Sequence, residues 1–183
     1  NRIIRIVLEQ TLLPLLASIH RVSVLFSLGY SAPLIHTMPS VVTIHDLNWY
    51  YHPEDFSRFN LFFWKYLTIL SARFSTRIIT DSTYSATSIR KVLNLKSSQV
   101  VPILHAGPTL VKANKYRAKR PYLLTVVASY PHKNLSTLLT AFATISAKFS
   151  NLDLYICGLS GRSEGFNSKL ITSLGLEDRV KIH

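Results

Sequence analysis

The chain has 183 residues and a formal net charge of +12 at neutral pH. With 48% hydrophobic and 16% charged residues, it has the composition of a globular protein and not of a disordered one. Its single cysteine excludes an internal disulfide. The excess of positive charge indicates an anionic partner, such as nucleic acid, an anionic membrane surface or a phosphorylated substrate.

The sequence predicts no transmembrane segment. The apolar stretches at residues 12–19 and 22–28 are too short to cross a bilayer, and His20 and Arg21 separate them. There is no N-terminal signal pattern, and the chain does not begin with methionine. We therefore interpret it as part of a longer protein.

Strand and helix patterns alternate along the chain. Apolar runs rich in β-branched residues predict strands, and stretches with apolar residues at helical spacing predict helices. The expected strands are residues 41–45, 77–81, 100–104, 122–128 and 152–157, with another opening at 180. The expected helices are residues 59–74, 82–93, 135–149 and 164–174. This alternation predicts an α/β fold with parallel sheets covered on both faces.

A polar, basic segment divides this series in two. Residues 109–121 contain five lysines and arginines without an acidic residue and end at Pro121, so we place a linker there. The predicted domains are residues 1–108 and residues 122–183. The basic run suits a solvated linker as well as it suits a binding patch.

Polar residues and glycines follow the carboxyl ends of the predicted strands, where open parallel sheets bind their ligands. They are His45-Asp46, Asp81-Ser82, His105, Ser129–Lys133 and Gly158–Gly161.

Lys133 has the setting of an anion site. An apolar run ends in a short polar turn, the lysine follows, and an amphipathic helix begins directly after Asn134. The first amides of a helix are unpaired, the helix dipole adds partial positive charge, and the lysine adds a full charge. The alternative is that Asn134 caps the helix and Lys133 is only solvated.

Familiar signatures of other functions are absent from the sequence. It contains no Gly-x-Gly-x-x-Gly, no phosphate-binding loop ending in Gly-Lys-Ser/Thr, no Gly-x-Ser-x-Gly and no zinc-type spacing of cysteine and histidine. A basic nucleic-acid-binding protein would suit the charge, but no recognition-helix or RNA-binding aromatic motif accompanies it. We therefore expect no specific nucleic-acid partner.

Three segments together resemble glycosyltransferase family 4, and bacterial mannosyltransferases in particular. Residues 39–47 are similar to the family's strand that ends in His-Asp-Leu, and Pro53 follows. Residues 78–85 and 100–107 are similar to the later strands of the same N-terminal domain. Residues 128–135, with glycines after the next strand, are similar to the start of the C-terminal domain. The resemblance covers nearly the whole chain.

The resemblance implies a GT-B architecture of two Rossmann-like domains, both incomplete here. Residues 1–108 would belong to the acceptor-side domain and residues 122–183 to the domain that binds the nucleotide sugar. Lys133 matches the lysine that contacts the donor diphosphate, and His45 matches the N-domain histidine that contacts the transferred sugar or its phosphate. The resemblance places the other candidates on the donor side (His132, Ser129, Gly158, Gly161) and on the acceptor side (Asp46, Asn48, Ser82).

Each of these candidates also has a purely structural interpretation. His45 would be a satisfied histidine at a strand end, and Gly158 and Gly161 would be ordinary turn glycines. The chain also departs from the family pattern. His132 stands where the family commonly has arginine, and no two glutamates are eight positions apart, as they are in the family's C-terminal acidic motif.

The implied activity is transfer of a hexose, with retention, from a nucleoside-diphosphate sugar to a glycan or lipid-linked acceptor in polysaccharide biosynthesis. It needs no cofactor and no metal, because the lysine and the helix terminus neutralise the leaving diphosphate. The expected location is cytoplasmic, with peripheral contact at the inner face of the membrane. The alternative is a truncated, catalytically incompetent fragment that binds a nucleotide diphosphate weakly or not at all.

Overall fold

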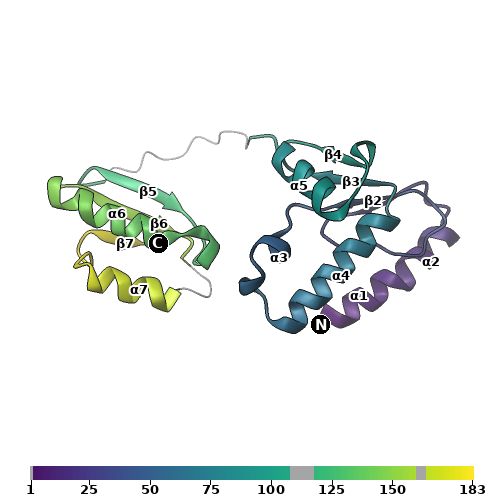
Figure 1. The fold of residues 1–183 in the computed structure, drawn as a ribbon, viewed down its shortest axis with the longest axis horizontal. Coiled ribbons are helices and arrows are strands. Elements are labelled where there is room, and N and C mark those ends of the chain that lie inside the picture. The colour runs from purple at the N-terminus through teal and green to yellow at the C-terminus, as the bar shows by residue number, and fades with distance from the viewer. Residues whose placement is uncertain (1, 108–117, 160–163) are drawn as a thin grey trace. The chain divides into compact units, whose positions relative to one another are not determined.

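The computed structural model describes residues 2–107, 118–159 and 164–183 (Figure 1). Its internal contacts divide the chain into two compact units, Asn1–Thr109 and Leu110–His183. Most of the predicted linker 109–121 lies outside the described residues. Each unit is described by itself below.

The first unit is built on a parallel sheet in the order β1-β2-β3-β4. Its strands are β1 (Leu25–Ser27), β2 (Ser40–Thr43), β3 (Arg77–Thr80) and β4 (Val100–Pro102). Its helices are α1 (Arg2–Gln10), α2 (Leu12–Ile19), α3 (Asn48–Tyr51), α4 (Arg58–Phe74) and α5 (Thr83–Leu93), with 3₁₀ turns at Pro53–Asp55 and Ser97–Gln99.

The core of the first unit lies between the strands and helices α3, α4 and α5. Val42, Ile78 and Val100 lie on three adjacent strands and are almost fully buried, and Ile89 of α5 packs in the same cluster. Burying aliphatic side chains of this kind stabilises a fold by roughly 1.5–3 kcal/mol each. This packing fixes the register of β2, β3 and β4, and so fixes where each strand ends.

The second unit has a three-stranded parallel sheet in the order β5-β6-β7. The strands are β5 (Tyr122–Val126), β6 (Asp153–Cys157) and β7 (Val180–Ile182). A 3₁₀ turn at Pro131–Lys133 leads into α6 (Leu135–Lys148), and α7 (Glu164–Ser173) precedes β7. Leu139 and Phe142 of α6 pack against Leu154 and Ile156 of β6 in the core.

The predicted α/β class is confirmed, and every predicted strand and helix is present. Most strands are shorter at their carboxyl ends than expected: β2 ends at Thr43 and β4 at Pro102, not at His45 and Leu104. One further backbone hydrogen bond follows each of these two strands, from Ile44 N–H to the Ile79 carbonyl and from Ile103 N–H to the Thr80 carbonyl. His45 therefore lies in the loop beyond β2 and not within the strand.

The expected covering of both sheet faces is not met at β5. Leu123 and Leu124 point to opposite faces of the sheet, and both are exposed, as is Val126. Strand β5 pairs with β6 alone and lies at the edge of the sheet. Among the described residues, the core cluster of this unit joins α6 and α7 to β6 and β7 and includes none from β5.

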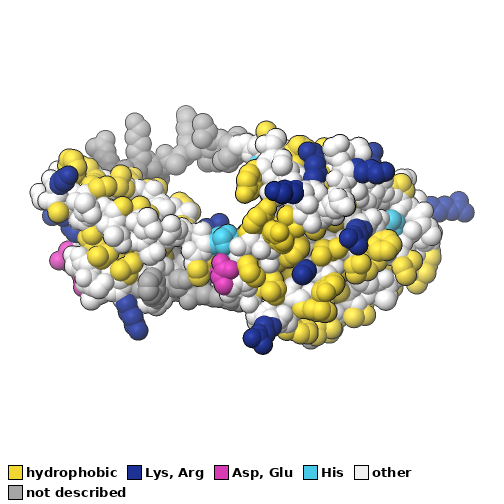
Figure 2. Space-filling model, in the orientation of Figure 1, with side chains coloured by type: hydrophobic (Ala, Val, Ile, Leu, Met, Phe, Trp, Pro, Cys, Tyr) yellow, Lys and Arg dark blue, Asp and Glu magenta, His cyan; other side chains and the backbone are white. Residues whose placement is uncertain are grey.

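Helices α1 and α2 were not predicted, and they expose much of their apolar surface. Ile4 and Val7 of α1 are more than half exposed, and so are Phe59 and Phe62 of α4. Figure 2 shows apolar side chains alternating with lysines and arginines on the face that carries α1 and α4. Among the described helices, none has both the length and the hydropathy required to cross a membrane.

Candidate functional site

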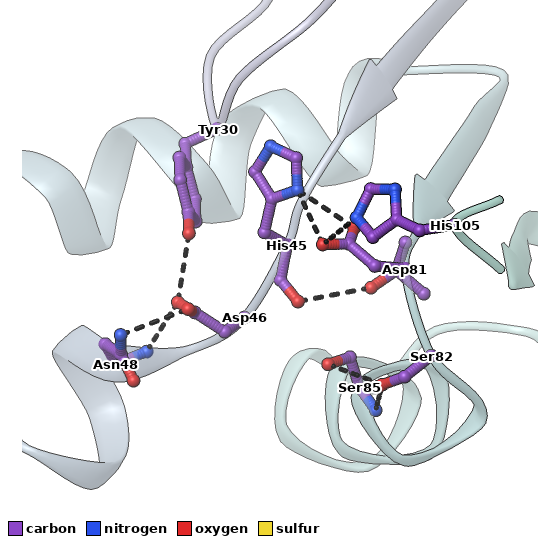
Figure 3. Close-up of polar contacts among 9 residues, drawn as sticks. Tyr30, His45, Asp46, Asn48, Asp81, Ser82, Ser85 and His105 are labelled. Atoms are coloured by element: carbon purple, nitrogen blue, oxygen red, sulfur yellow. Dashed lines mark hydrogen bonds and ion pairs between the residues drawn. The ribbon is translucent and has the colours of Figure 1, made fainter. Parts of the chain in front are cut away.

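The first unit brings three predicted strand-end residues together. Strands β2, β3 and β4 are adjacent and parallel, so the loops that leave their carboxyl ends meet at one edge (Figure 3). His45 Nδ1 lies 2.9 Å from each carboxylate oxygen of Asp81, and His105 Nε2 lies 3.0 Å from Asp81 Oδ2. Burial opposes ionisation of Asp81. The hydrogen bonds and charges of the two histidines outweigh burial and hold the pKa of this carboxyl below its ordinary value.

Asp46 is held from two sides. Its carboxylate accepts from the backbone N–H of Asn48 at 3.1 Å and from Asn48 Nδ2 at 3.0 Å, an Asx-type turn that leads into α3. On the other side, the hydroxyl of Tyr30 donates to Asp46 Oδ1 at 3.0 Å. Burial, and then the negative charge of Asp46, raise the pKa of the Tyr30 phenol well above its ordinary value. Tyr30 therefore stays protonated and remains a donor to Asp46.

Ser82 has a structural role in this arrangement. It is the N-cap of α5, and its hydroxyl oxygen accepts from the backbone N–H of Ser85 at 3.0 Å. This cap holds the start of α5 directly after Asp81. The predicted acceptor-side residues thus lie near one another, with Asp46 and Asn48 in one cluster and Ser82 at the adjacent helix start.

Two pockets open beside Asp46 and Asn48. One, of about 300 Å³, is lined by polar side chains together with Leu47 and two tyrosines. Its lining residues are Asp46, Leu47, Asn48, Tyr51, His52, Tyr84, Ser85 and Ser88. The second, of about 170 Å³, is lined by aromatic side chains. It lies against Tyr30, Asp46, Asn48, Trp49, Phe56, Trp64 and Thr68.

In the second unit, Lys133 is exposed at the end of the 3₁₀ turn that precedes α6. Asn134 has left-handed backbone angles (φ 52°, ψ 38°), and its side chain makes no capping hydrogen bond to α6. Asn134 Oδ1 instead accepts from the Thr137 hydroxyl at 2.7 Å. The capping alternative for Asn134 is therefore wrong, and its side chain leaves the first amides of α6 without a partner.

Ser129 and His132, two of the predicted donor-binding residues, differ in exposure. Ser129 is fully buried, and its hydroxyl oxygen accepts from Asn167 Nδ2 at 2.6 Å, so its side chain has no surface to offer a ligand. The His132 ring stacks on Tyr130, with the ring centroids 5.9 Å apart.

Gly158 is the glycine of this region that needs its special conformation. Its φ is +82°, which side-chain-bearing residues rarely adopt, and its N–H donates to the carbonyl of His183 at 3.2 Å. That amide is already paired. Gly161 lies outside the described residues.

His45, Asp81 and His105 are also a set that could hold a divalent cation. Each offers one ligand atom, and these atoms lie within 4.8 Å of one another. Imidazole and carboxylate are common ligands of zinc and related metals. The sequence analysis expected no metal, because the three residues follow separate strands and only the register brings them together.

Sequence reasoning missed the roles of three residues near His45. Asp81 and His105 were expected at this edge of the sheet, but nothing in the sequence indicated that they share a contact. Tyr30 was not considered at all. It reaches Asp46 from the loop after β1, a short strand that the sequence did not predict, so no local signal could have identified it.

The sequence of this chain is similar to sequences of glycosyltransferases. Residues 108–183 match the family model described as Glycosyl transferases group 1. Over 149 residues the chain is 26% identical to the O-antigen chain mannosyltransferase RfbU of Salmonella typhimurium. That match covers 79% of this chain and 40% of the relative, so the chain spans less than half of the curated relative's length.

Solved structures of glycosyltransferases resemble the fold. TarM has a TM-score of 0.62 at 14% identity, over 87% of this chain and 32% of its own. The pneumococcal O-GlcNAc transferase GtfA in complex with UDP and GlcNAc has a TM-score of 0.57 at 14% identity, over 80% of this chain and 29% of its own. At such identities the likeness shows the fold alone. The predicted resemblance to GT-B glycosyltransferases is confirmed at that level, while membership of family 4 stays a prediction.

Replacing Gly158 by alanine should destabilise the second unit by about 1–2 kcal/mol. A positive φ carries that cost for an L-residue. An added Cβ would meet only Val127 O, at an ordinary 3.7 Å, so the backbone alone accounts for the effect. The matched control is Gly165→Ala in α7, where open space and helical geometry predict a gain of about 0.5–1 kcal/mol. Thermal unfolding followed by circular dichroism measures both variants, and equal shifts would contradict this account.

Proposed function

We propose that the chain is part of a retaining glycosyltransferase of family 4 that transfers a hexose from a nucleoside-diphosphate sugar to a glycan or lipid-linked acceptor. The observation that carries this proposal is the position of Lys133. It is an exposed lysine beside the uncapped N-terminus of α6, in the segment that matches the Glycosyl transferases group 1 model. The 26% identity to a mannosyltransferase supports mannose as the candidate sugar.

The physical role of Lys133 follows from the charge that develops during transfer. When the glycosidic bond to phosphate breaks, the nucleoside diphosphate leaves with additional negative charge. Unpaired helix amides, the helix dipole and the lysine ammonium all favour that charge, and they are in place before the reaction. We propose that the donor diphosphate binds at Lys133 and the first amides of α6, without a metal or other cofactor. Structural neighbours solved in complex with UDP support a nucleotide of this kind.

The first unit would supply the other substrate contacts. We propose that His45 contacts the transferred sugar or its phosphate. Asp46 and Asn48, beside the larger pocket, would contact the acceptor. Hydroxyl and amide side chains around an aromatic wall suit a sugar, because sugars offer both polar edges and apolar faces. Polysaccharide biosynthesis is then the expected setting of the activity.

The alternative is that this chain alone is a catalytically incompetent fragment. The exposed edge strand β5 favours this alternative. Calorimetry with UDP-glucose and GDP-mannose distinguishes the two possibilities, because a fragment of this kind would give weak binding or none, and no transfer.

Lys133→Ala should weaken nucleoside-diphosphate binding about 10- to 100-fold. A hydrogen bond to a charged group contributes about 1.5–3 kcal/mol, and every 1.4 kcal/mol changes the affinity tenfold. Calorimetric titration of GDP and UDP into the chain measures the change. Lys148→Ala, at the other end of the same helix, is the control and should bind as the unsubstituted chain does. If the Lys133 variant bound with the same affinity as the unsubstituted chain, the assignment of this lysine to the donor site would be wrong.

We further propose a peripheral location at the cytoplasmic face of a membrane. Exposed apolar residues on α1 and α4 share their face with basic residues, which suits an anionic lipid surface (Figure 2).

The chain should therefore co-sediment with vesicles that contain an anionic phospholipid, and less with vesicles of phosphatidylcholine alone. Ile4→Asp on α1 should reduce the bound fraction several-fold, because it places a carboxylate on the apolar face. Thr144→Asp on α6 is the control and should have no effect. Equal sedimentation with both kinds of vesicle would contradict the proposal.

A further inference from the structure

The contact between His45 and Asp81 links the candidate catalytic histidine to a residue that has no assigned role. His45 Nδ1 faces the carboxylate, 2.9 Å from each oxygen, and the ring's other nitrogen lies on the side away from it (Figure 3). We propose that Asp81 is a positioning residue, which holds the neutral His45 imidazole as the Nδ1–H tautomer and leaves Nε2 as a hydrogen-bond acceptor for a ligand. Only the last step, use of Nε2 by a ligand, rests on the proposed function.

The tautomer follows from the ionisation of Asp81. An aspartate carboxyl is ionised at neutral pH, and with both oxygens 2.9 Å from His45 Nδ1 it can only accept hydrogen bonds. A neutral imidazole carries one N–H. With an anion at hydrogen-bond distance from Nδ1, the proton is favoured on that nitrogen, and Nε2 keeps its lone pair.

Hydrogen bonds to the backbone connect the segments that carry His45 and Asp81. The Thr80 hydroxyl, fully buried, donates to the backbone carbonyl of His45 at 3.4 Å, which ties the residue before Asp81 to His45 itself. Ile103 N–H donates to the Thr80 carbonyl at 2.8 Å, which anchors the end of β3 to the segment after β4. On the other side of Asp81, Ser82 caps α5.

The His45 ring is restrained from a second direction. Tyr30 packs edge-on against it, with the ring centroids 5.6 Å apart and the planes at 65°. Asp46 in turn holds the Tyr30 hydroxyl. The titratable groups around His45 are thus Tyr30, Asp46, Asp81 and His105.

His105 is the weaker partner of Asp81. Its side chain is 75% exposed, against 39% for His45, and the contact involves one carboxylate oxygen. We expect it to help keep Asp81 ionised without setting the His45 tautomer. A divalent ion shared by all three side chains is the competing arrangement. The 2.9–3.0 Å separations are those of ordinary hydrogen bonds.

Nitrogen-15 spectra of the histidine side chains test the proposal on the whole chain. At a pH above the histidine titration, the His45 signals, identified by their loss in His45→Gln, should show the Nδ1–H tautomer. Asp81→Asn should shift the population toward Nε2–H, because an amide no longer requires a donor. His105→Gln and the distant control Asp178→Asn should leave the tautomer unchanged. The same tautomer in Asp81→Asn and in the unsubstituted chain would overturn the proposal.

Two further measurements separate the competing outcomes. Adding zinc chloride should leave the His45 and His105 signals in place; joint shifts at micromolar zinc would overturn the proposal in favour of a metal site.

In a donor-turnover assay, Asp81→Asn should lower kcat/KM about 10- to 100-fold, as loss of a residue that orients a histidine ligand typically does. Absence of turnover in the unsubstituted chain would count against the proposed function, while the tautomer shift would still support the role of Asp81. Unchanged turnover in Asp81→Asn would overturn the positioning role.

Discussion

The candidate site of the first unit depends on one constraint, the parallel pairing of strands β2, β3 and β4 in a fixed register. Because β2, β3 and β4 run side by side in the same direction, their carboxyl ends reach one edge together. Buried aliphatic residues on each strand hold that register, and a slip of one residue would turn every side chain to the opposite face. His45, Asp81 and His105 are far apart in the sequence, and they meet only because the strands before them are fixed in this way.

The second unit also has a parallel sheet whose strands lead into loops, but different chemical groups lie at its candidate site. Its sheet also delivers the chain to a helix start, but there the ligand-facing groups are backbone amides and one lysine. The left-handed conformation of Asn134 turns the chain from the 3₁₀ turn into α6 and keeps the Asn134 side chain away from the helix amides. An acidic side chain at that position would cap the helix and compete with an anionic ligand. This arrangement supports the proposal that a phosphate group binds there.

Much of the fold could be predicted from the sequence, because the signals are local. The apolar runs before His45, Asp81 and Ser129 read as strands, and the stripe from Leu135 to Phe142 reads as a helix. The short strand β1 and helix α2 carry no clear period, whereas α1 has apolar residues at helical spacing that the sequence prediction overlooked. The candidate site was predicted in outline. Contacts across strands, such as Tyr30 with Asp46, depend on register and rotamers, which no local pattern encodes.

The structure also distinguishes the candidate residues by their exposure and hydrogen bonding. Lys133 keeps the exposed position that a diphosphate contact requires, whereas the Ser129 side chain is buried and the Gly158 amide is paired within the fold. In the first unit, the residues around His45 form one connected set of hydrogen bonds and ring contacts, so the site there is better described as a network than as a single histidine. The match of residues 108–183 to Glycosyl transferases group 1 supports the proposal that the anion bound at Lys133 is a nucleoside diphosphate.

The central claim is that a nucleoside diphosphate binds at the start of α6. Backbone amide chemical shifts, recorded while GDP or UDP is titrated into the nitrogen-15-labelled chain, test it most directly. This account predicts saturable shifts concentrated at residues 130–137, with the largest at the amides of Leu135 and Ser136. Shifts absent there, or spread over the basic surface without saturation, would contradict it.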